Sequence, residues 1–304
     1  MSWEEISQQA CARLDASIPS QWRIPSDKLP PADQADVMDF PYKSGLCSER
    51  EIAITTSSAT DIVKHIAVGE WKAEDVTRAF CKRAAITHQL TNCLTVVMFD
   101  DAIDRAKHLD DHLKRTGKTV GPLHGLPISL KDNFNIIGKT SATGFCAWAD
   151  EPMKYESTIV GILRDLGAVA YVKTNVPTAM MIAESVNNCY GRYGLPSPNG
   201  TNIQDLTKSR TVNPRNRMLT SGGSSGGESA LITAFGSPLG VGTDIGGSLR
   251  IPAAMTGIFT IRPSYGRFPH FDARSGMAGQ EAVGSVHGPM ARSIADLKLF
   301  AENV

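Results

Sequence analysis

The sequence predicts an α/β fold in which short buried strands alternate with helices. Four apolar segments of strand length follow one another along the chain, at 93–99, 126–130, 168–172 and 239–241. Segments with helical periodicity lie around and between them, at 59–90, 100–115, 155–166, 178–186 and 228–235. Alternation of this kind is typical of a β-sheet covered by helices. The chain of 304 residues is long enough for one large domain or two small ones.

The N-terminal part is expected to be a helix followed by an irregular wrap. Ser2 and Glu5 have the spacing of a capping box, and Ile6, Ala10 and Leu14 then recur on one helical face. We expect this helix to pack on the body of the protein; a membrane-surface helix is the alternative. Residues 17–55 are rich in proline, which predicts irregular structure. We therefore divide the chain into 1–54 and a main domain, 55–304.

Charge and composition exclude several classes of function. Lys plus Arg (31) equals Asp plus Glu (31), whereas a nucleic-acid surface needs a basic excess. No transmembrane segment is expected, because no uninterrupted apolar run reaches about 18 residues. The N-terminus lacks the pattern of a signal peptide, and no cysteines have C-x-x-C spacing. These features predict a cytoplasmic protein with reduced thiols, and they leave a homodimer open.

The first segment with chemical potential is GLPISLKDN, 125–133, in which Lys131 ends an apolar strand. Most lysines lie at the surface, and that is the simplest alternative here. If Lys131 is buried, its pKa falls, because loss of water disfavours the ammonium form. A neutral amine can act as a general base.

The second segment is SGGSSGGE, 221–228, which also fits a flexible linker. A helical stretch follows it directly, however, and a glycine-rich turn that opens a helix can present a reactive side chain or backbone N–H groups. The segment fits the G-x-S-x-G nucleophile elbow as well, with Ser224 as nucleophile. That interpretation requires a histidine and an acidic residue, and His270, His287 and Asp272 are available but lie in no recognisable context.

The third segment is GTDIGGSLR, 242–250. Consecutive glycines let several backbone N–H groups converge where side chains would block them. Such a nest can stabilise the oxyanion of acyl transfer, with Ser248 placed to attack; a tight structural turn is the alternative. Asp244 and Arg250 are expected either to pair across the loop or to be separately solvated.

Together the three segments resemble the amidase signature family. The run GGSSGGESALITAFGSPLGVGTDIGGSLRIP, 222–252, is similar to the family signature, including the separation of 24 residues between Ser224 and Ser248 (248 − 224). Supporting similarity lies at 121–132, 173–177 and 211–214, and the resemblance covers about 55–304. The first residues resemble the eukaryotic acetamidase or general amidase branch, a relative of fatty acid amide hydrolase. The resemblance implies a mixed β-sheet covered by helices on both faces.

The resemblance also implies a function and a set of site residues. The expected enzyme is an amidase that hydrolyses an acetamide-like or other aliphatic amide through an acyl-enzyme, without metal or cofactor. Ser248 is the implied nucleophile, Ser224, in a cis peptide, the proton relay, and Lys131 the base. The implied oxyanion hole and substrate contacts are Met180, Ser224, Ile245, Gly246, Gly247 and Ser248. The implied supporting residues are Ser225, Thr243, Asp244 and Arg250.

The chain departs from the family pattern in two places. Residues 193–210 have no counterpart, and we expect an inserted exposed loop; a retained intron of 54 nucleotides, for 18 codons, is the alternative. Family members also continue past Val304, so the C-terminal part of the fold is expected to be missing. An inactive binding or regulatory fragment is therefore the alternative to an active amidase, and an esterase that uses Ser224 with a histidine is a third reading.

Overall fold

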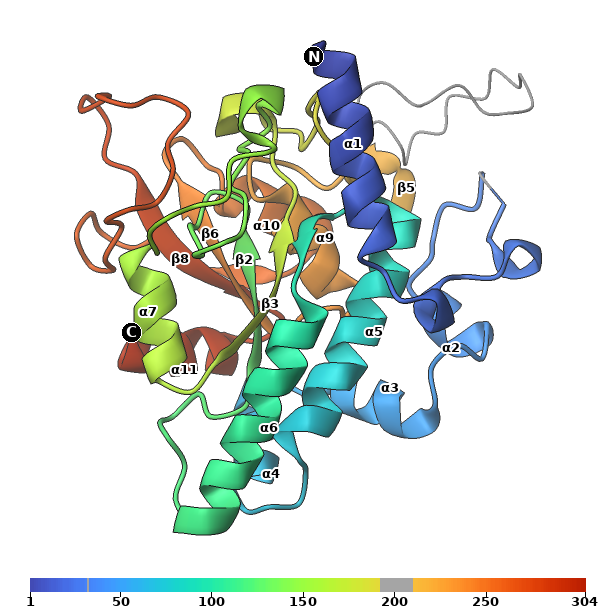
Figure 1. Cartoon of the computed structure of the whole chain (residues 1–304), viewed down its shortest axis with the longest axis vertical. Coiled ribbons are helices and arrows are strands. Elements are labelled where there is room, and N and C mark those ends of the chain that lie inside the picture. The colour runs from blue at the N-terminus through green and yellow to red at the C-terminus, as the bar shows by residue number, and fades with distance from the viewer. Residues whose placement is uncertain (32, 192–209) are drawn as a thin grey trace.

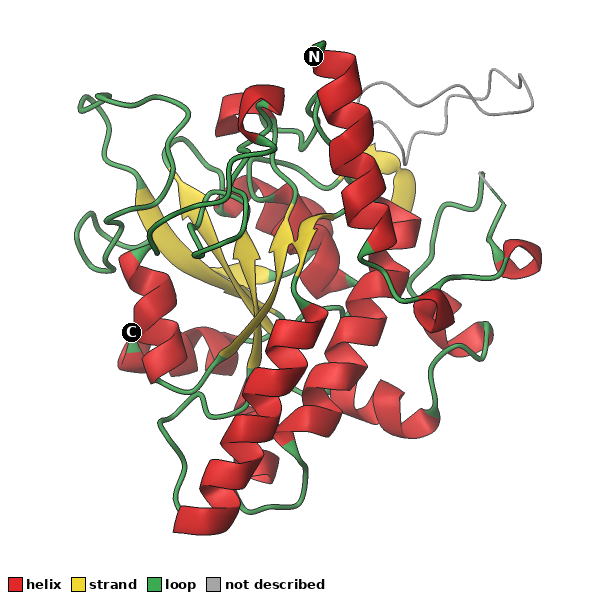
Figure 2. Ribbon diagram, in the orientation of Figure 1, coloured by secondary structure: helices red, strands yellow, loops and turns green. Residues whose placement is uncertain are grey.

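The computed structural model describes residues 1–31, 33–191 and 210–304 (Figure 1). Its centre is a six-stranded mixed β-sheet with the strand order β1-β3-β2-β6-β8-β7, and helices surround the sheet (Figure 2). The α/β fold is therefore confirmed. Strands β4 (Val212–Asn213) and β5 (Asn216–Thr220) form a separate two-stranded sheet.

The middle of the large sheet is parallel. Strand β2 (Pro127–Lys131) pairs in parallel with both β3 (Val169–Thr174) and β6 (Leu239–Asp244). All residues of β2 and β6 are buried, as is usual for parallel strands that are covered on both faces. The other three strands are antiparallel to their neighbours: β1 (Leu94–Val97), β7 (Phe259–Thr260) and β8 (Val286–Ala291).

The connections explain why helices cover both faces. Helix α7 (Thr158–Asp165) lies between β2 and β3 in the chain, and α9 (Gly226–Thr233) lies between β3 and β6. The two crossovers run in opposite directions along the sheet, so right-handed connections place their helices on opposite faces (Figure 1). A point where the strand order reverses is the usual place for a ligand, outside the carboxyl ends of the strands. Lys131 and Asp244 are the last residues of β2 and β6.

The remaining helices frame this sheet. Helix α1 (Trp3–Ala16) begins with the capping box of Ser2 and Glu5 and buries Ala10 and Leu14, as predicted. Helices α5 (Ala73–Thr91) and α6 (Phe99–Thr116) pack against each other and against β3. Helix α10 (Arg250–Thr256) packs against α9 and β7, and α11 (Ile294–Asn303) packs against β8 and β7.

The structure differs from the predicted secondary structure in several places. The helix expected at 59–90 is two helices, α4 (Ala59–Ala67) and α5, because the chain turns at Gly69 with a φ of +75°. The wrap at 17–55 contains α2 (Phe40–Lys43) and α3 (Glu49–Thr56), and α3 has a capping box of its own that the prolines obscured. Strand β8 was missed because it contains a glycine and a proline, residues that argue against a central strand.

The helix expected at 178–186 is also wrong. Only a 3-10 turn, η4 (Thr178–Met180), forms there. Ala179 and Met180 have φ angles of +57° and +59°, which a right-handed helix cannot contain. Contacts from a distant part of the chain impose this backbone, as described below.

The predicted insertion at 193–210 lies outside the described residues, except for Arg210. The guanidinium of Arg210 donates to Glu184 Oε1 at 2.5 Å. The division into 1–54 and 55–304 stays a prediction. In the part of the chain that the structure describes, no helix is long and apolar enough to cross a bilayer.

The entry into α9 offers a test of packing. A Cβ on Gly227 would lie 2.3 Å from the backbone N of Asn175 and 2.7 Å from the backbone O of Cys93. We expect Gly227→Ala to lower the free energy of unfolding by at least about 1–3 kcal/mol, because backbone atoms must move. Urea denaturation measures this, and Gly246→Ala is the matched control, since its Cβ would meet nothing within 4 Å. Equal stability of the two variants would contradict the packing described here.

Candidate active site

Lys131 is the centre of the site. It ends β2, its side chain is 0% exposed, and it is therefore buried as predicted. Its Nζ lies 2.6 Å from Ser224 Oγ and 2.6 Å from Thr243 Oγ1. The amine thus contacts one hydroxyl from the turn before α9 and one from β6. A lysine at the end of a surface strand would make neither contact.

Burial changes the acidity of this amine. It lowers the pKa of Lys131 to about 7, although the negative charges of Asp244 and Glu228 act in the opposite direction. A substantial fraction of Lys131 is therefore neutral near pH 7 and can accept a proton. The same amine in water would be almost entirely protonated at this pH.

Ser224 is held by a tightly packed glycine-rich turn. The Gly223–Ser224 peptide bond is cis, as the resemblance implied. A Cβ on Gly223 would lie 2.6 Å from Ile182 O. A Cβ on Gly226 or on Gly227 would lie equally close to atoms of other residues. These glycines are required by the approach of neighbouring chain segments, so the flexible-linker interpretation is wrong.

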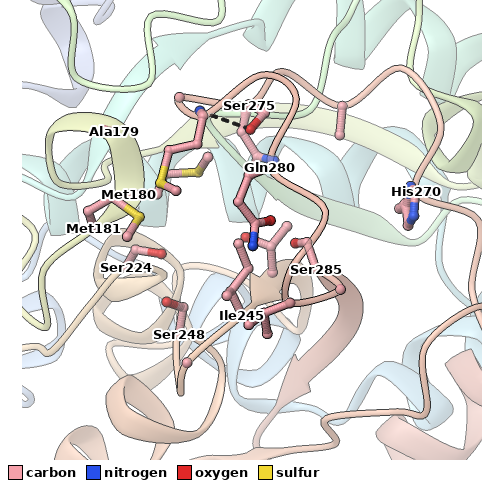
Figure 3. Close-up of a pocket in the computed structure, with 18 of the residues that line it drawn as sticks. Ala179, Met180, Met181, Ser224, Ile245, Ser248, His270, Ser275, Gln280 and Ser285 are labelled. Atoms are coloured by element: carbon pink, nitrogen blue, oxygen red, sulfur yellow. Dashed lines mark hydrogen bonds between the residues drawn. The ribbon is translucent and has the colours of Figure 1, made fainter.

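Ser225 connects this turn to the second glycine-rich loop. Its backbone N–H donates to Ser248 O at 3.2 Å, and its Oγ contacts both the backbone N and O of Thr243 at 3.4 Å. The segments that carry Ser224 and Ser248 are therefore bonded to each other directly. Both serines line one cavity, and Figure 3 shows their side chains next to each other.

Asp244 shapes the loop that carries Ser248. Its carboxylate accepts hydrogen bonds from Gly247 N (2.8 Å) and Leu249 N (3.1 Å), and both of its oxygens bind the Arg250 guanidinium at 3.0 Å. Of the two alternatives that the sequence left open for Asp244 and Arg250, the structure has the pairing across the loop. Burial alone would raise the pKa of Asp244, but Arg250 and the two N–H groups outweigh it and lower the pKa. The carboxylate is thus ionised and holds the loop closed.

The loop leaves a set of backbone donors free. The N–H groups of Ile245, Gly246 and Ser248 have no acceptor among the residues that the structure describes. Gly247 was expected to be a fourth oxyanion donor, and this is wrong, because its N–H is bonded to the Asp244 carboxylate. Gly247 is also absent from the cavity wall, whereas Ile245, Gly246 and Ser248 line it.

A cavity of about 1110 Å³ lies above the two serines. One wall is the η4 turn with Met180, and the opposite wall is the segment 270–285 (Figure 3). The apolar lining near the serines includes Met180, Met181, Ile182, Ile245 and Ile251. The predicted substrate contact Met180 therefore faces the same space as Ser224 and Ser248.

The histidines do not form a second catalytic arrangement. His270 contacts the hydroxyl of Tyr265, and His287 Nδ1 contacts Pro269 O. Neither contacts Ser224, whose hydroxyl is bonded to Lys131, and Figure 3 shows His270 well apart from both serines. The nucleophile-elbow interpretation, with Asp272 as third member, is therefore wrong. Across 1–31, 33–191 and 210–304, no three His, Cys, Asp or Glu side chains are grouped as metal ligands.

Comparison with known proteins identifies the family of this chain. The family model described as Amidase matches residues 75–304. The chain belongs to the amidase signature family. It is 45% identical to the acetamidase of Emericella nidulans and 44% identical to the acetamidase of Aspergillus oryzae, over 303 residues in each case.

A solved structure of fatty acid amide hydrolase matches this chain with a TM-score of 0.87 and 38% identity over 99% of the chain. A bacterial aryl acylamidase matches with a TM-score of 0.70 and 26% identity over 82% of the chain. The alignments cover 51% and 52% of the two acetamidases and 50% of the hydrolase structure. The chain thus spans about half the length of the relatives it matches.

The sequence analysis missed one acidic residue close to the site. Glu228, in the first turn of α9, is fully buried, and its carboxyl oxygens lie 2.6 Å from Ser129 Oγ and 3.0 Å from Thr174 Oγ1. Burial raises the pKa of Glu228 to about 8, against the effect of these hydroxyls and of Lys131. The available signal was an acidic residue inside an otherwise small and apolar segment.

The buried amine predicts a pH-dependent difference in stability. Since the pKa of Lys131 is about 7 in the folded protein and 10.5 when exposed, the folded state binds fewer protons than the unfolded state between these values. Stability of the wild type therefore rises with pH through this window. We expect Lys131→Met to be more stable by on the order of a few kcal/mol at pH 7, with the gap shrinking toward pH 9–10.

Urea denaturation of both proteins at several pH values measures this gap. Lys72→Met, which replaces an exposed lysine, is the control that should show no such trend. A gap that is constant or grows with pH would rule out a neutral buried amine.

Proposed function

We propose that this amidase hydrolyses carboxylic amides through an acyl-enzyme on Ser248, with Ser224 and Lys131 moving the protons. The observation that carries the proposal is the fully buried Lys131 amine, with its Nζ 2.6 Å from Ser224 Oγ. Family membership and the shared cavity of the two serines support it.

Acylation begins with proton transfer to the neutral amine. Lys131 takes the proton of Ser224, and Ser224 takes that of Ser248, so that Ser248 Oγ can attack the amide carbon. The resulting oxyanion is met by the free N–H groups of Ile245, Gly246 and Ser248. The protonated Lys131 then returns its proton through Ser224 to the leaving nitrogen, which departs as ammonia or an amine.

Deacylation repeats the relay with water. The relay activates a water molecule that attacks the acyl-enzyme, and the acid is released as Ser248 recovers its proton. Each proton that is removed from a serine or from water stays within the site, because the Lys131 amine holds it until it is returned. A base with a pKa near the working pH is suited to both directions of transfer.

Aliphatic amides are the substrate class that fits the lining. The surface next to the serines is formed by Met180, Met181, Ile182 and Ile245, which offer apolar contact and no fixed charge. The similarity to fungal acetamidases points the same way. We propose acetamide and longer aliphatic amides as substrates.

The role of the nucleophile is tested by substitution. We expect Ser248→Ala to abolish release of ammonia from acetamide or a longer aliphatic amide, and Lys131→Ala to lower kcat by about 10²–10⁴-fold. Ser26→Ala, at an exposed serine, is the matched control. Full turnover by Ser248→Ala would refute the assignment. A folded but wholly inactive wild type would indicate a binding fragment.

The pH profile tests the role of the amine. Because the neutral form of Lys131 is the base, kcat/KM should rise with pH through about 7. Glu228, whose own pKa is raised to about 8, is only partly ionised where Lys131 titrates. The ionised fraction raises the pKa of Lys131, so Glu228→Gln, which keeps the side-chain shape, should move this rise to slightly lower pH. Ser129→Ala, which removes a hydroxyl that contacts Glu228 but no charge, is the control. A rise that stays in place or moves to higher pH in Glu228→Gln would contradict this role.

A further inference from the structure

A second buried lysine lies close to the site but has no part in the proposed reaction. Lys173, in β3, and Asp132, the residue after Lys131, are both 0% exposed, and Lys173 Nζ lies 3.9 Å from Asp132 Oδ1. Charges without water must be paired and hydrogen-bonded, since an isolated buried charge is strongly destabilising. The hydrogen-bond partners of Asp132 and Lys173 therefore show which part of the structure this ion pair holds in place.

Most of these partners belong to one turn, 140–144. Asp132 Oδ2 accepts from the backbone N of Thr143 at 2.6 Å, and Lys173 Nζ donates to Ser141 Oγ at 2.6 Å and to Thr140 O at 2.5 Å. The other oxygen of Asp132 accepts from Thr95 Oγ1, in β1, at 2.6 Å. The ion pair thus attaches the turn to the ends of three neighbouring strands.

The turn has a backbone that needs such support. Thr143 has a φ of +45°, an unfavourable value for a β-branched residue that persists only where the surroundings impose it. The hydrogen bond from Thr143 N to Asp132 is one of these constraints. Arg274 NH1 adds another bond to this turn, to Ser141 O at 3.2 Å.

The turn 140–144 contacts η4, which forms one wall of the cavity. Thr143 O accepts from the backbone N of Ala179 at 3.0 Å, and a Cβ on Gly144 would lie 2.6 Å from Thr178 Cα. Ala179 and Met180 are the two residues with positive φ in η4, and both line the cavity (Figure 3). One continuous set of bonds therefore leads from Asp132 to Met180.

We propose that the buried pair of Asp132 and Lys173 positions Met180 against the substrate through the turn 140–144, and so sets the affinity for the amide. These two residues are positioning residues, and the proposal rests on the function proposed above. The reacting serines are held by other contacts, since Ser224 Oγ is bonded to Lys131 Nζ and the backbone O of Ser248 accepts from the backbone N of Ser225. Loss of the pair should therefore weaken substrate binding and leave the reactivity of Ser248 in place.

The first experiment separates binding from reactivity. The variant Asp132→Asn/Lys173→Met removes both charges at once, so that no lone buried charge remains. We expect its KM for an aliphatic amide to rise by about tenfold to a hundredfold, since a displaced contact about 1 Å away from its place can have effects of this size. The rate at which methanesulfonyl fluoride, a small acylation mimic, modifies Ser248 should stay within about threefold of the wild type.

The matched control removes an ion pair that is remote from the cavity. Lys82 Nζ and Glu51 Oε2 lie 2.9 Å apart, between α5 and α3. Glu51→Gln/Lys82→Met should leave both KM and the modification rate unchanged. An unchanged KM in the Asp132/Lys173 variant, or a modification rate that falls in parallel with kcat/KM, would overturn the proposal.

A second measurement does not depend on turnover. In protein labelled with ¹³C at the methionine methyl groups, the Met180 resonance, assigned with Met180→Leu, should shift in the Asp132/Lys173 variant. The resonance of Met218, in β5 and outside the cavity wall, should not. An unmoved Met180 resonance would overturn the positioning role.

The two measurements also separate this proposal from the proposed function. A wild type that neither hydrolyses amides nor reacts with the sulfonyl fluoride would count against the function, while the Met180 resonance would still decide the positioning. If the double variant does not fold, Thr95→Val removes a single hydrogen bond to Asp132. It should shift the same resonance in the same direction by a smaller amount, and no shift there would count against the proposal.

Discussion

An amine without water is the constraint on which the rest of the site depends. The Lys131 side chain is enclosed by β6 and by the turn before α9, and among the described residues its hydrogen-bond partners are the Ser224 hydroxyl and Thr243. An enclosure of this kind requires backbone segments to approach more closely than side chains permit, which is why glycines precede and follow Ser224. The composition of the turn, the burial of the amine and its low pKa are one physical arrangement.

At the ends of β2 and β3, successive residues make contacts on opposite faces of the sheet. Lys131 and Thr174 contact the side of Ser224 and α9, through Ser224 and Glu228, whereas their chain neighbours Asp132 and Lys173 contact the turn 140–144. Alternation of side chains along a strand makes this division natural. The reacting groups and the wall of the cavity can therefore be supported by separate hydrogen-bond networks although they begin at adjacent positions.

The sequence predicted those features that local pattern determines. The buried strand before Lys131 and the helix after the glycine-rich turn each depend on neighbours in the chain. The pairing of Asp244 with Arg250 was one of two alternatives that the sequence left open. The η4 turn was mistaken for a helix because Thr143, 36 positions before Ala179 (179 − 143), imposes its backbone. Strand β8 was missed because its partner β6, and not its own composition, makes it a strand. Glu228 was missed because only the fold brings Ser129 and Thr174 to it.

The hydrogen bonds of Ser225 to Thr243 and Ser248 restrict insertions and deletions in the segment between Ser224 and Ser248. The interval from Ser224 to Ser248 holds one complete helix, one complete strand and the loop closed by Asp244, with both of its ends joined through Ser225. One residue more or fewer inside β6 would turn its side chains to the opposite face, and in α9 it would rotate the helix by about 100°. Side chains within the interval can be exchanged, but the number of residues in α9 and β6 is constrained, because both ends of the interval are bonded to each other.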